Sequence, residues 1–359
     1  MEGGGAQRDA ILLANAMAKR GWRVSIPTLQ PDGPLRELVD RAVEVVALSA
    51  GSLKMAVPAF RQAFARLGPD AVVLSSEAAQ NVVAALAHAT LPRTRCPKLL
   101  LREVAAPSIA KAYDPYVQNR LAYRVLGHAY RHCDRVLTLT DGARADLIAN
   151  FAVPPERIDV MRANAVLDEA SQARLLGTDM AAGREPDLIV CLGRLSVEKD
   201  QLTLIEAFAR VLAKRPARLV LVGDGPLRGD IEQMAAALGV AHSLTLTGFQ
   251  SDPFFWLKRA ELAVCSSRFE GFGNAIVEAL ACGTPVVSTD CPFGPREILG
   301  DGLYGRLVAV GNPSAMADAL IEELGKHPDR ARLRARAWQF TGEAAAIELE
   351  RVIAGLAPH

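Results

Sequence analysis

The sequence contains no Asp-x-Asp pair, no Cys-x-x-Cys pair, no Walker A loop and no Gly-x-Ser-x-Gly turn. An Asp-x-Asp pair can hold a divalent ion on a diphosphate, because hard cations prefer carboxylate oxygens. Paired cysteines bind zinc or carry out redox chemistry, the Walker A loop holds nucleotide phosphates, and the glycine–serine turn presents a nucleophile. The sequence therefore contains none of the usual motifs for these functions.

An excess of one charge is also missing, since 41 Lys and Arg residues balance 40 Asp and Glu residues for a net charge of +1. That balance gives no reason to expect a nucleic-acid partner. No apolar run approaches membrane-spanning length, so we expect a cytoplasmic protein whose membrane contact, if present, is peripheral and on the inner face of the cell membrane. The arginine-rich stretches at 120–131 and 330–336 favour solvated helix faces, with anionic lipid headgroups as the alternative.

Aromatic residues make up only 5% of the chain, and cysteine occurs six times. Cys191 and Cys265 fall in apolar, strand-like runs. We therefore predict buried, reduced thiols and no disulfides. The six cysteines are Cys96, Cys133, Cys191, Cys265, Cys282 and Cys291.

The length of 359 residues exceeds what one hydrophobic core usually supports and suits two domains. Apolar runs alternate with amphipathic segments, which predicts an α/β protein with parallel sheets and crossover helices. The polar stretch 171–185 predicts the interdomain linker, between domains at 1–170 and 186–340. Predicted strands are 22–27, 44–48, 71–75, 99–102, 135–140, 188–193, 218–222, 243–247, 262–266 and 285–288, and predicted helices include 8–20 and 343–356.

The segment 266–287 carries two glutamates eight positions apart, Glu270 and Glu278. Its residues predict a strand, a glycine loop, a short helix, a glycine stop and a second strand. Asn274 is the predicted N-cap of the helix, and Gly283 is predicted to end it. A helix N-terminus favours an anion, and carboxylates accept hydrogen bonds from sugar hydroxyls. The glutamate pair alone arises often by chance, so the prediction depends on the whole segment.

This segment resembles the donor-sugar signature of retaining glycosyltransferases of family four, which have the GT-B fold. The continuation at 290–299 resembles a branch of that family common in bacterial surface-polysaccharide synthesis. The resemblance implies two Rossmann-like domains with a donor/acceptor cleft between them, and a C-terminal helix at 341–359 that crosses back to the first domain. The missing Asp-x-Asp pair argues against the metal-dependent GT-A class.

Two cations, Arg194 and Lys199, follow the first predicted strand of the second half, at the sheet edge where doubly wound folds bind ligands. A guanidinium and an ammonium there suit a diphosphate; without the family motif they would be read as surface cations. The resemblance implies that both stabilise the departing diphosphate, that Glu270 holds the sugar hydroxyls, and that Glu278 holds the nucleotide ribose. The predicted catalytic residues are Arg194, Lys199 and Glu270.

The turn at 223–229 does not have the Gly-x-Gly-x-x-Gly spacing, and the next predicted strand has no acidic residue at its end, so an NAD site is disfavoured. The resemblance assigns this turn to the donor nucleotide, the segment Phe249–Gln250 to the base, and the first glycine loop to the transferred sugar and phosphate. The predicted donor-binding residues are Gly4, Gly5, Gly193, Gly223, Gly225, Phe249, Gln250, Gly271, Phe272, Gly273, Asn274 and Glu278.

The first half departs from the family where many members have a histidine after a mid-domain strand. Arg102 and Glu103 occupy that position here. They are candidate acceptor or sugar contacts, and a structural ion pair is the alternative. Thr140 and Asn164 fit family turns that shape the cleft.

The chain opens on Gly3, Gly4 and Gly5 directly before a predicted helix. In the resembling family this loop follows the first, central strand, which has no counterpart in the sequence. A central gap would expose unpaired backbone groups, so we expect about six to ten mostly apolar residues upstream, enough for one strand. The alternative is a domain that does without this strand.

The resemblance implies a nucleotide-diphosphate sugar as donor, with a UDP-sugar favoured over a GDP-sugar, and no cofactor or metal. The acceptor is expected to be a hydroxyl of a lipid-linked or surface polysaccharide. Alternatives are a sucrose- or trehalose-type synthase with a small soluble acceptor, and an inactive GT-B scaffold that partners an active transferase.

Overall fold

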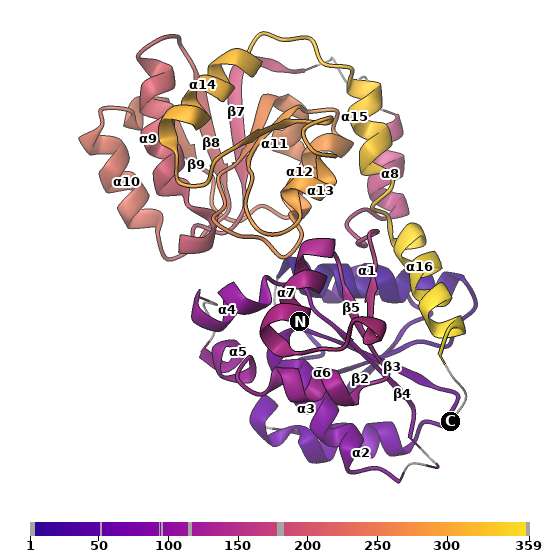
Figure 1. Ribbon diagram of the computed structural model, residues 1–359. Helices are drawn as coiled ribbons and strands as arrows, with labels where there is room; N and C mark the ends of the chain where they lie inside the picture. The colour runs from indigo at the N-terminus through magenta and orange to yellow at the C-terminus, as the bar shows by residue number, and fades with distance from the viewer. Residues whose placement is uncertain are drawn as a thin grey trace. The chain divides into compact units, whose positions relative to one another are not determined.

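The computed structural model describes residues 4–50, 52–92, 94, 96–113, 117–177 and 183–356. These residues form two compact units (Figure 1). The first unit contains the chain up to Asp168 together with the residues from Phe340 onward. The second unit contains Glu169–Gln339.

The second unit is built on a six-stranded parallel sheet in the order β9-β8-β7-β10-β11-β12. This is the order of a doubly wound sheet, in which the chain starts in the middle, fills one half and then returns to fill the other. The reversal lies between β7 and β10. The strands are β7 (Glu185–Leu192), β8 (Arg218–Val222), β9 (Leu244–Leu246), β10 (Ala260–Cys265), β11 (Val286–Thr289) and β12 (Arg306–Val308).

Helices cover both faces of this sheet (Figure 1). On one face, Phe208 of α9 and Met316 of α14 are fully buried against strand residues such as Leu219. On the other face, α11 and α12 lie against β7 and β10. The helices are α8 (Glu169–Leu176), α9 (Gln201–Leu212), α10 (Arg228–Ala237), α11 (Phe254–Arg259), α12 (Asn274–Ala281), α13 (Pro295–Ile298), α14 (Pro313–Glu323) and α15 (Arg330–Ala337).

In the first unit, the described strands form two separate parallel sheets, β1-β2 and β3-β4-β5-β6. Helix α1 packs against α16 and contributes to the cores beside both sheets, through Leu12 and Leu13 in one and Ile11 in the other. In the described residues no strand precedes α1. The strands are β1 (Ser25–Thr28), β2 (Glu44–Ala47), β3 (Val72–Ser76), β4 (Lys98–Arg102), β5 (Arg135–Thr138) and β6 (Ile158–Val160).

Helices of the first unit, and short 3-10 turns in both units, complete the described elements. The helices are α1 (Gly5–Lys19), α2 (Val57–Ala65), α3 (Ala78–Ala89), α4 (Pro107–Tyr113), α5 (Val117–Ala122), α6 (Leu126–His132), α7 (Asp141–Phe151) and α16 (Gly342–Ala354). The turns are η1 (Arg36–Leu38), η2 (Leu53–Met55), η4 (Pro155–Arg157), η5 (Val197–Lys199) and η6 (Ala241–Ser243).

All ten predicted strands are confirmed, with bounds that differ by at most three residues. The predicted strands do not include β6 and β12, each of only three residues. The stretch expected as a linker contains part of α8, which the sequence also did not predict. Leu175 of that helix is fully buried. Residues 178–182 of the stretch lie outside the described residues.

The six cysteines are all free and buried, which confirms the prediction of buried thiols. Burial disfavours the thiolate and raises the pKa of Cys191 and of Cys282 to about 12. These thiols therefore stay protonated at neutral pH.

The longest described helix, α1, has 15 residues, whereas a membrane span needs about 20 apolar residues. Within the described part of the chain, no helix is both long enough and apolar enough to cross a membrane.

Candidate functional site

Two loops of the second unit meet where its strand order reverses. One follows β7 and the other follows β10, so both lie at the carboxyl edge of the sheet. Ser266 Oγ donates a hydrogen bond to the carbonyl of Lys199 at 2.7 Å, and the Arg268 amide donates to the carbonyl of Glu198 at 2.8 Å. Arg268 also forms an ion pair with Asp200 at 3.0 Å. These contacts join the loops at the edge where doubly wound sheets bind ligands.

The central contact of this site is an ion pair between Lys199 and Glu270. The ammonium Nζ lies 2.6 Å from Glu270 Oε1 and 2.8 Å from Oε2. Ser267 Oγ donates a further hydrogen bond to Oε1 at 2.6 Å. The side chains of Lys199 and Glu270 are only 25% and 9% exposed. Burial alone would lower the pKa of Lys199, but nearby groups, above all the Glu270 carboxylate, outweigh burial and raise that pKa, so Lys199 stays charged.

Arg194 lies in the same loop as Lys199, and its side chain is exposed. Gln201, the first residue of α9, donates from Nε2 to the Arg194 carbonyl at 2.8 Å and so fixes the bend between them. The structure therefore brings two of the predicted catalytic residues into one loop, with Glu270 opposite.

Helix α12 begins at Asn274, after the glycine loop that follows Glu270, and carries Glu278 in its second turn. Its N-cap is Gly273 with φ of 113°, so the prediction that Asn274 caps the helix is wrong, and Asn274 is the first helical residue. Glycine takes this left-handed conformation without steric cost, which lets the loop turn sharply into the helix. Glu278 is 8% exposed, and a helix start of this kind favours an anion.

The end of α12 is firmly held. Gly283 stops the helix as predicted: its amide donates to Leu280 O at 2.8 Å and the Thr284 amide donates to Ala279 O at 3.0 Å, a Schellman arrangement. Three guanidinium groups then bind the last carbonyls. They are Arg184 on Cys282 O at 2.6 Å, Arg330 on Gly283 O at 2.8 Å and Arg334 on Ala281 O at 3.2 Å. Cations at a helix C-terminus stabilise it.

The predicted donor-nucleotide turn packs directly on the loop after β7. A Cβ at Gly223 would lie 2.0 Å from the carbonyl oxygen of Gly193, and one at Gly225 would lie 2.3 Å from that of Leu195. Only glycine fits at either place, so close backbone packing alone explains why both positions are glycine. The Gly223 amide donates to Gly248 O at 3.0 Å, which brings the base segment alongside. Both residues of the base segment are exposed to solvent: Phe249, with an exposed fraction of 66%, and Gln250.

The predicted residues of the second unit thus lie in the loops after β7, β8, β9 and β10 of one sheet, except Asn274 and Glu278, which lie on α12. The sequence did not single out Ser266 and Asp200, which join the loops after β7 and β10, or Ser267, which binds Glu270 within its own loop. The two serines lie inside the signature segment, but nothing in the pattern distinguished their hydroxyls from ordinary loop residues.

In the first unit, Arg102 ends β4 and Glu103 follows it, and each is 1% exposed. Among the described residues they do not pair with one another, so the predicted alternative of a mutual ion pair is wrong. Arg102 Nη2 donates to Asn164 Oδ1, and Asn164 Nδ2 donates to Asp9 Oδ2 at 2.9 Å. Burial lowers the pKa of Arg102, and Asp9 opposes that shift.

Glu103 binds different partners. Its carboxylate accepts hydrogen bonds from Tyr130 Oη at 2.6 Å, Tyr123 Oη at 3.1 Å and the Ala105 amide at 2.9 Å. Burial raises the pKa of Glu103 to about 7 although these donors oppose the shift. Contact of Arg102 or Glu103 with a sugar or acceptor stays a prediction. Thr140 caps α7 by accepting from the Ala143 amide at 3.0 Å.

The predicted glycine loop of the first unit starts α1. Gly4 is the N-cap, in extended conformation, and Gly5 is the first helical residue. No atom lies within 4 Å of a Cβ placed at Gly4. Local packing therefore does not require glycine at position 4.

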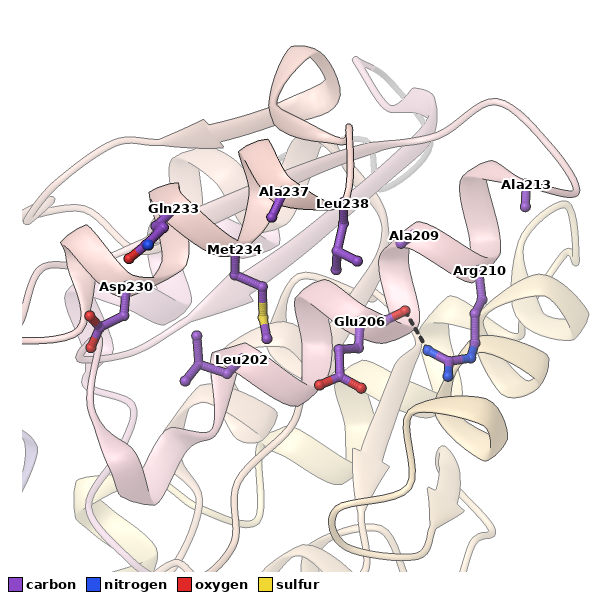
Figure 2. Close-up of a pocket in the computed structure, with 10 residues that line it drawn as sticks. All are labelled: Leu202, Glu206, Ala209, Arg210, Ala213, Asp230, Gln233, Met234, Ala237 and Leu238. Atoms are coloured by element: carbon purple, nitrogen blue, oxygen red, sulfur yellow. Dashed lines mark hydrogen bonds between the residues drawn. The ribbon is translucent and has the colours of Figure 1, made fainter.

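A surface hollow of about 700 Å³ lies elsewhere in the second unit, between α9 and α10 (Figure 2). Leu202, Met234 and Leu238 give it an apolar lining, and Arg210 on its rim donates to the Glu206 carbonyl at 2.9 Å. None of the predicted site residues lines this hollow.

Comparison with known proteins matches both units. Residues 4–164 match the family model "Glycosyl transferase 4-like domain" and residues 186–326 match "Glycosyl transferases group 1". A Campylobacter jejuni enzyme, N-acetylgalactosamine-N,N'-diacetylbacillosaminyl-diphospho-undecaprenol 4-alpha-N-acetylgalactosaminyltransferase, is 30% identical over 265 residues, covering 72% of this chain and 70% of that enzyme. The chain belongs to glycosyltransferase family four.

Other relatives match shorter parts. The alpha-D-kanosaminyltransferase of Streptomyces kanamyceticus is 32% identical over 209 residues, covering 56% of this chain and 54% of that enzyme. Among solved structures, HepE of Anabaena with UDP-glucose has a TM-score of 0.77 at 20% identity, covering 99% of this chain and 97% of that one. The lipopolysaccharide outer core galactosyltransferase WaaB has a TM-score of 0.72 at 16% identity, covering 98% and 97%. These glycosyltransferases share the GT-B fold, which the chain therefore has.

Proposed function

We propose that this glycosyltransferase moves a sugar, with retention at the anomeric carbon, from a nucleotide-diphosphate sugar to a hydroxyl of a lipid-linked or surface-polysaccharide acceptor. The observation that carries the proposal is the Lys199–Glu270 pair, with Nζ–Oε1 at 2.6 Å, at the strand-order reversal and next to the start of α12. The Campylobacter relative, whose name gives a diphospho-undecaprenol acceptor, supports the acceptor class.

Each group would act on a different part of the donor. Arg194 and Lys199 would offset the charge that develops on the diphosphate as its bond to the sugar breaks, since fixed cations in a dry site stabilise such charge strongly. Glu270 would accept hydrogen bonds from sugar hydroxyls, and Glu278 from the ribose. Because Lys199 is already in contact with Glu270, one cation would connect the sugar side and the phosphate side of the donor.

A nucleotide-sugar screen tests the function. We expect UDP-sugars to raise the melting temperature, because a ligand at a hundred times its Kd stabilises the folded state by about 2.7 kcal/mol. NAD is the matched control and should leave the melting temperature unchanged. The stabilising donor should then be hydrolysed slowly without acceptor. Binding without hydrolysis or transfer would instead indicate an inactive scaffold.

Product stereochemistry tests the retaining mechanism. The anomeric configuration of the product, read from the coupling of its anomeric proton, should equal that of the donor. An inverted product would rule the mechanism out. Transfer to free fructose or glucose in place of a glycan acceptor would favour a sucrose- or trehalose-type activity.

We also predict that transfer needs no divalent metal. The sequence offers the cations Arg194 and Lys199 at the predicted diphosphate position and has no Asp-x-Asp pair to hold an ion. Activity should persist after dialysis against EDTA, measured as donor consumed per minute. Loss of activity in EDTA that magnesium restores would contradict the prediction.

A further inference from the structure

Asp200, the residue after Lys199, has a side chain whose role its own loop does not explain. It is the N-cap residue of α9, yet its side chain makes no capping hydrogen bond to the helix amides. Its backbone is left-handed, with φ of 48°, a conformation that glycine adopts more easily than aspartate. The side chain is nevertheless only 5% exposed. Neither the helix cap nor the backbone path therefore accounts for a carboxylate at this position.

The carboxylate of Asp200 binds the loop after β10. Arg268 lies there, two residues before Glu270, and meets it with two nitrogens: Nε lies 3.0 Å from Oδ2 and Nη2 lies 3.4 Å from Oδ1. Thr203 Oγ1 donates to Oδ2 at 2.9 Å and holds the carboxylate from the side of α9. A two-point contact of this kind fixes direction as well as distance. We refer to Asp200 and Arg268 as the cross-loop pair.

Two further contacts hold the same stretch of backbone. The Arg268 amide donates to the Glu198 carbonyl at 2.8 Å, and Ser266 Oγ donates to the Lys199 carbonyl at 2.7 Å. Residues 198, 199 and 200 are thus each tied to the segment 266–268, which leads to Glu270. Only the cross-loop pair joins two charged side chains, so substitution can remove it while the other two contacts remain.

We propose that the cross-loop pair is a positioning device for glycosyl transfer, which holds Lys199 and Glu270 at the spacing that the reaction requires. Both members act through these neighbours and not by contact with the donor. The spacing matters because a displacement of about 1 Å in an active site can lower the rate about a hundredfold. The inference rests on the proposed roles of Lys199 and Glu270.

Turnover and UDP affinity, measured on the same variants of the full chain, test the inference. Asp200→Gly removes the carboxylate and suits the left-handed backbone, so this variant should fold. We expect its hydrolysis of the UDP-sugar selected by the melting-temperature screen to slow about tenfold, less than the hundredfold limit because two ties between the loops remain. Its Kd for UDP, measured by calorimetry, should be unchanged. A purely structural loss would weaken both.

Further variants identify the contact itself. Arg268→Gln should show the same loss of turnover at unchanged UDP affinity. The double variant Asp200→Gly/Arg268→Gln should lose no more turnover than either single variant, because each change alone already removes the contact. Asp200→Asn tolerates the left-handed backbone and keeps a hydrogen-bond acceptor for Arg268, so it should recover part of the turnover.

Asp187 provides a matched control in the same unit. It also has a positive φ, of 61°, and pairs with an arginine, Arg215, at 2.6 Å. It lies near the start of β7, whereas the candidate site follows the end of that strand. Asp187→Gly should therefore keep the turnover and the UDP affinity of the unchanged protein.

Two results would overturn the inference alone. One is full turnover in both Asp200→Gly and Arg268→Gln while the unchanged protein is active. The other is a loss of UDP affinity in Arg268→Gln that matches its loss of turnover, which would make Arg268 a ligand of the diphosphate. An unchanged protein that consumes no donor, with or without acceptor, would instead refute the proposed function, and the inference with it.

Discussion

Replacing Lys199 with methionine is expected to lower the turnover number for glycosyl transfer by at least about a hundredfold. Removing one preorganised group that stabilises developing negative charge typically costs about a hundred- to a thousandfold in turnover. Lys199 lies in the loop after β7 and contacts Glu270 of the loop before α12, where the diphosphate is proposed to leave. Methionine keeps a similar length and apolar stem, so the change removes the charge with little change in volume.

The same substitution should also destabilise the second unit, because it leaves Glu270 without its cation. Glu270 is 9% exposed, and Ser267 would be the hydroxyl that still binds its carboxylate. Removing one partner of a buried ion pair lowers the free energy of unfolding by about 3–5 kcal/mol. This is an upper estimate here because Lys199 is 25% exposed. Urea unfolding measures this loss in the free energy of unfolding.

A double variant separates the two effects. Lys199→Met/Glu270→Gln removes both charges, so it should regain most of the stability while transfer stays lost. The control is Lys214→Met, which breaks an ion pair with Asp318 in which both side chains are more than 60% exposed; such pairs contribute about 0–1 kcal/mol. If Lys199→Met kept full turnover, Lys199 would have no part in stabilising the leaving group.

The sequence predicted the sheet elements well because buried parallel strands have a strong local signal. β8 is apolar throughout after Arg218 and is bounded by turn residues, and its observed bounds equal the predicted ones. Gly283 was predicted correctly because a helix stop depends on one residue and its neighbours. The cap at Gly273 was missed, since Asn274 is by composition an equally good cap and only the backbone path distinguishes them.

Contacts between distant segments were not predictable in this way. Lys199 and Glu270 are 71 residues apart, and no spacing rule states that their side chains touch. Their shared sheet edge followed from the strand order, but the direct pairing required the structure. Glu103 shows the same limit: nothing in its place after β4 indicates that the hydroxyls of Tyr123 and Tyr130 donate hydrogen bonds to its carboxylate.

The two signature glutamates are expected to have separable roles. Glu278→Ala should weaken binding of the bare nucleoside diphosphate, because the ribose hydroxyls lose an acceptor on α12. A hydrogen bond to a charged group contributes about 1.5–3 kcal/mol, which corresponds to about a ten- to hundredfold loss of affinity.

Glu270→Ala should leave that affinity equal or slightly higher, because Lys199 loses its carboxylate partner at 2.6 Å and becomes available to the diphosphate. The turnover of Glu270→Ala should nevertheless fall, since the sugar loses the group that orients it.

Calorimetry with UDP measures the affinities of the two variants, and donor consumption measures their turnover. Glu206→Ala on α9 is the matched control, a glutamate away from the site. Equal losses of UDP affinity in the two variants would refute the separate roles, because a purely structural function of the loop would affect both alike.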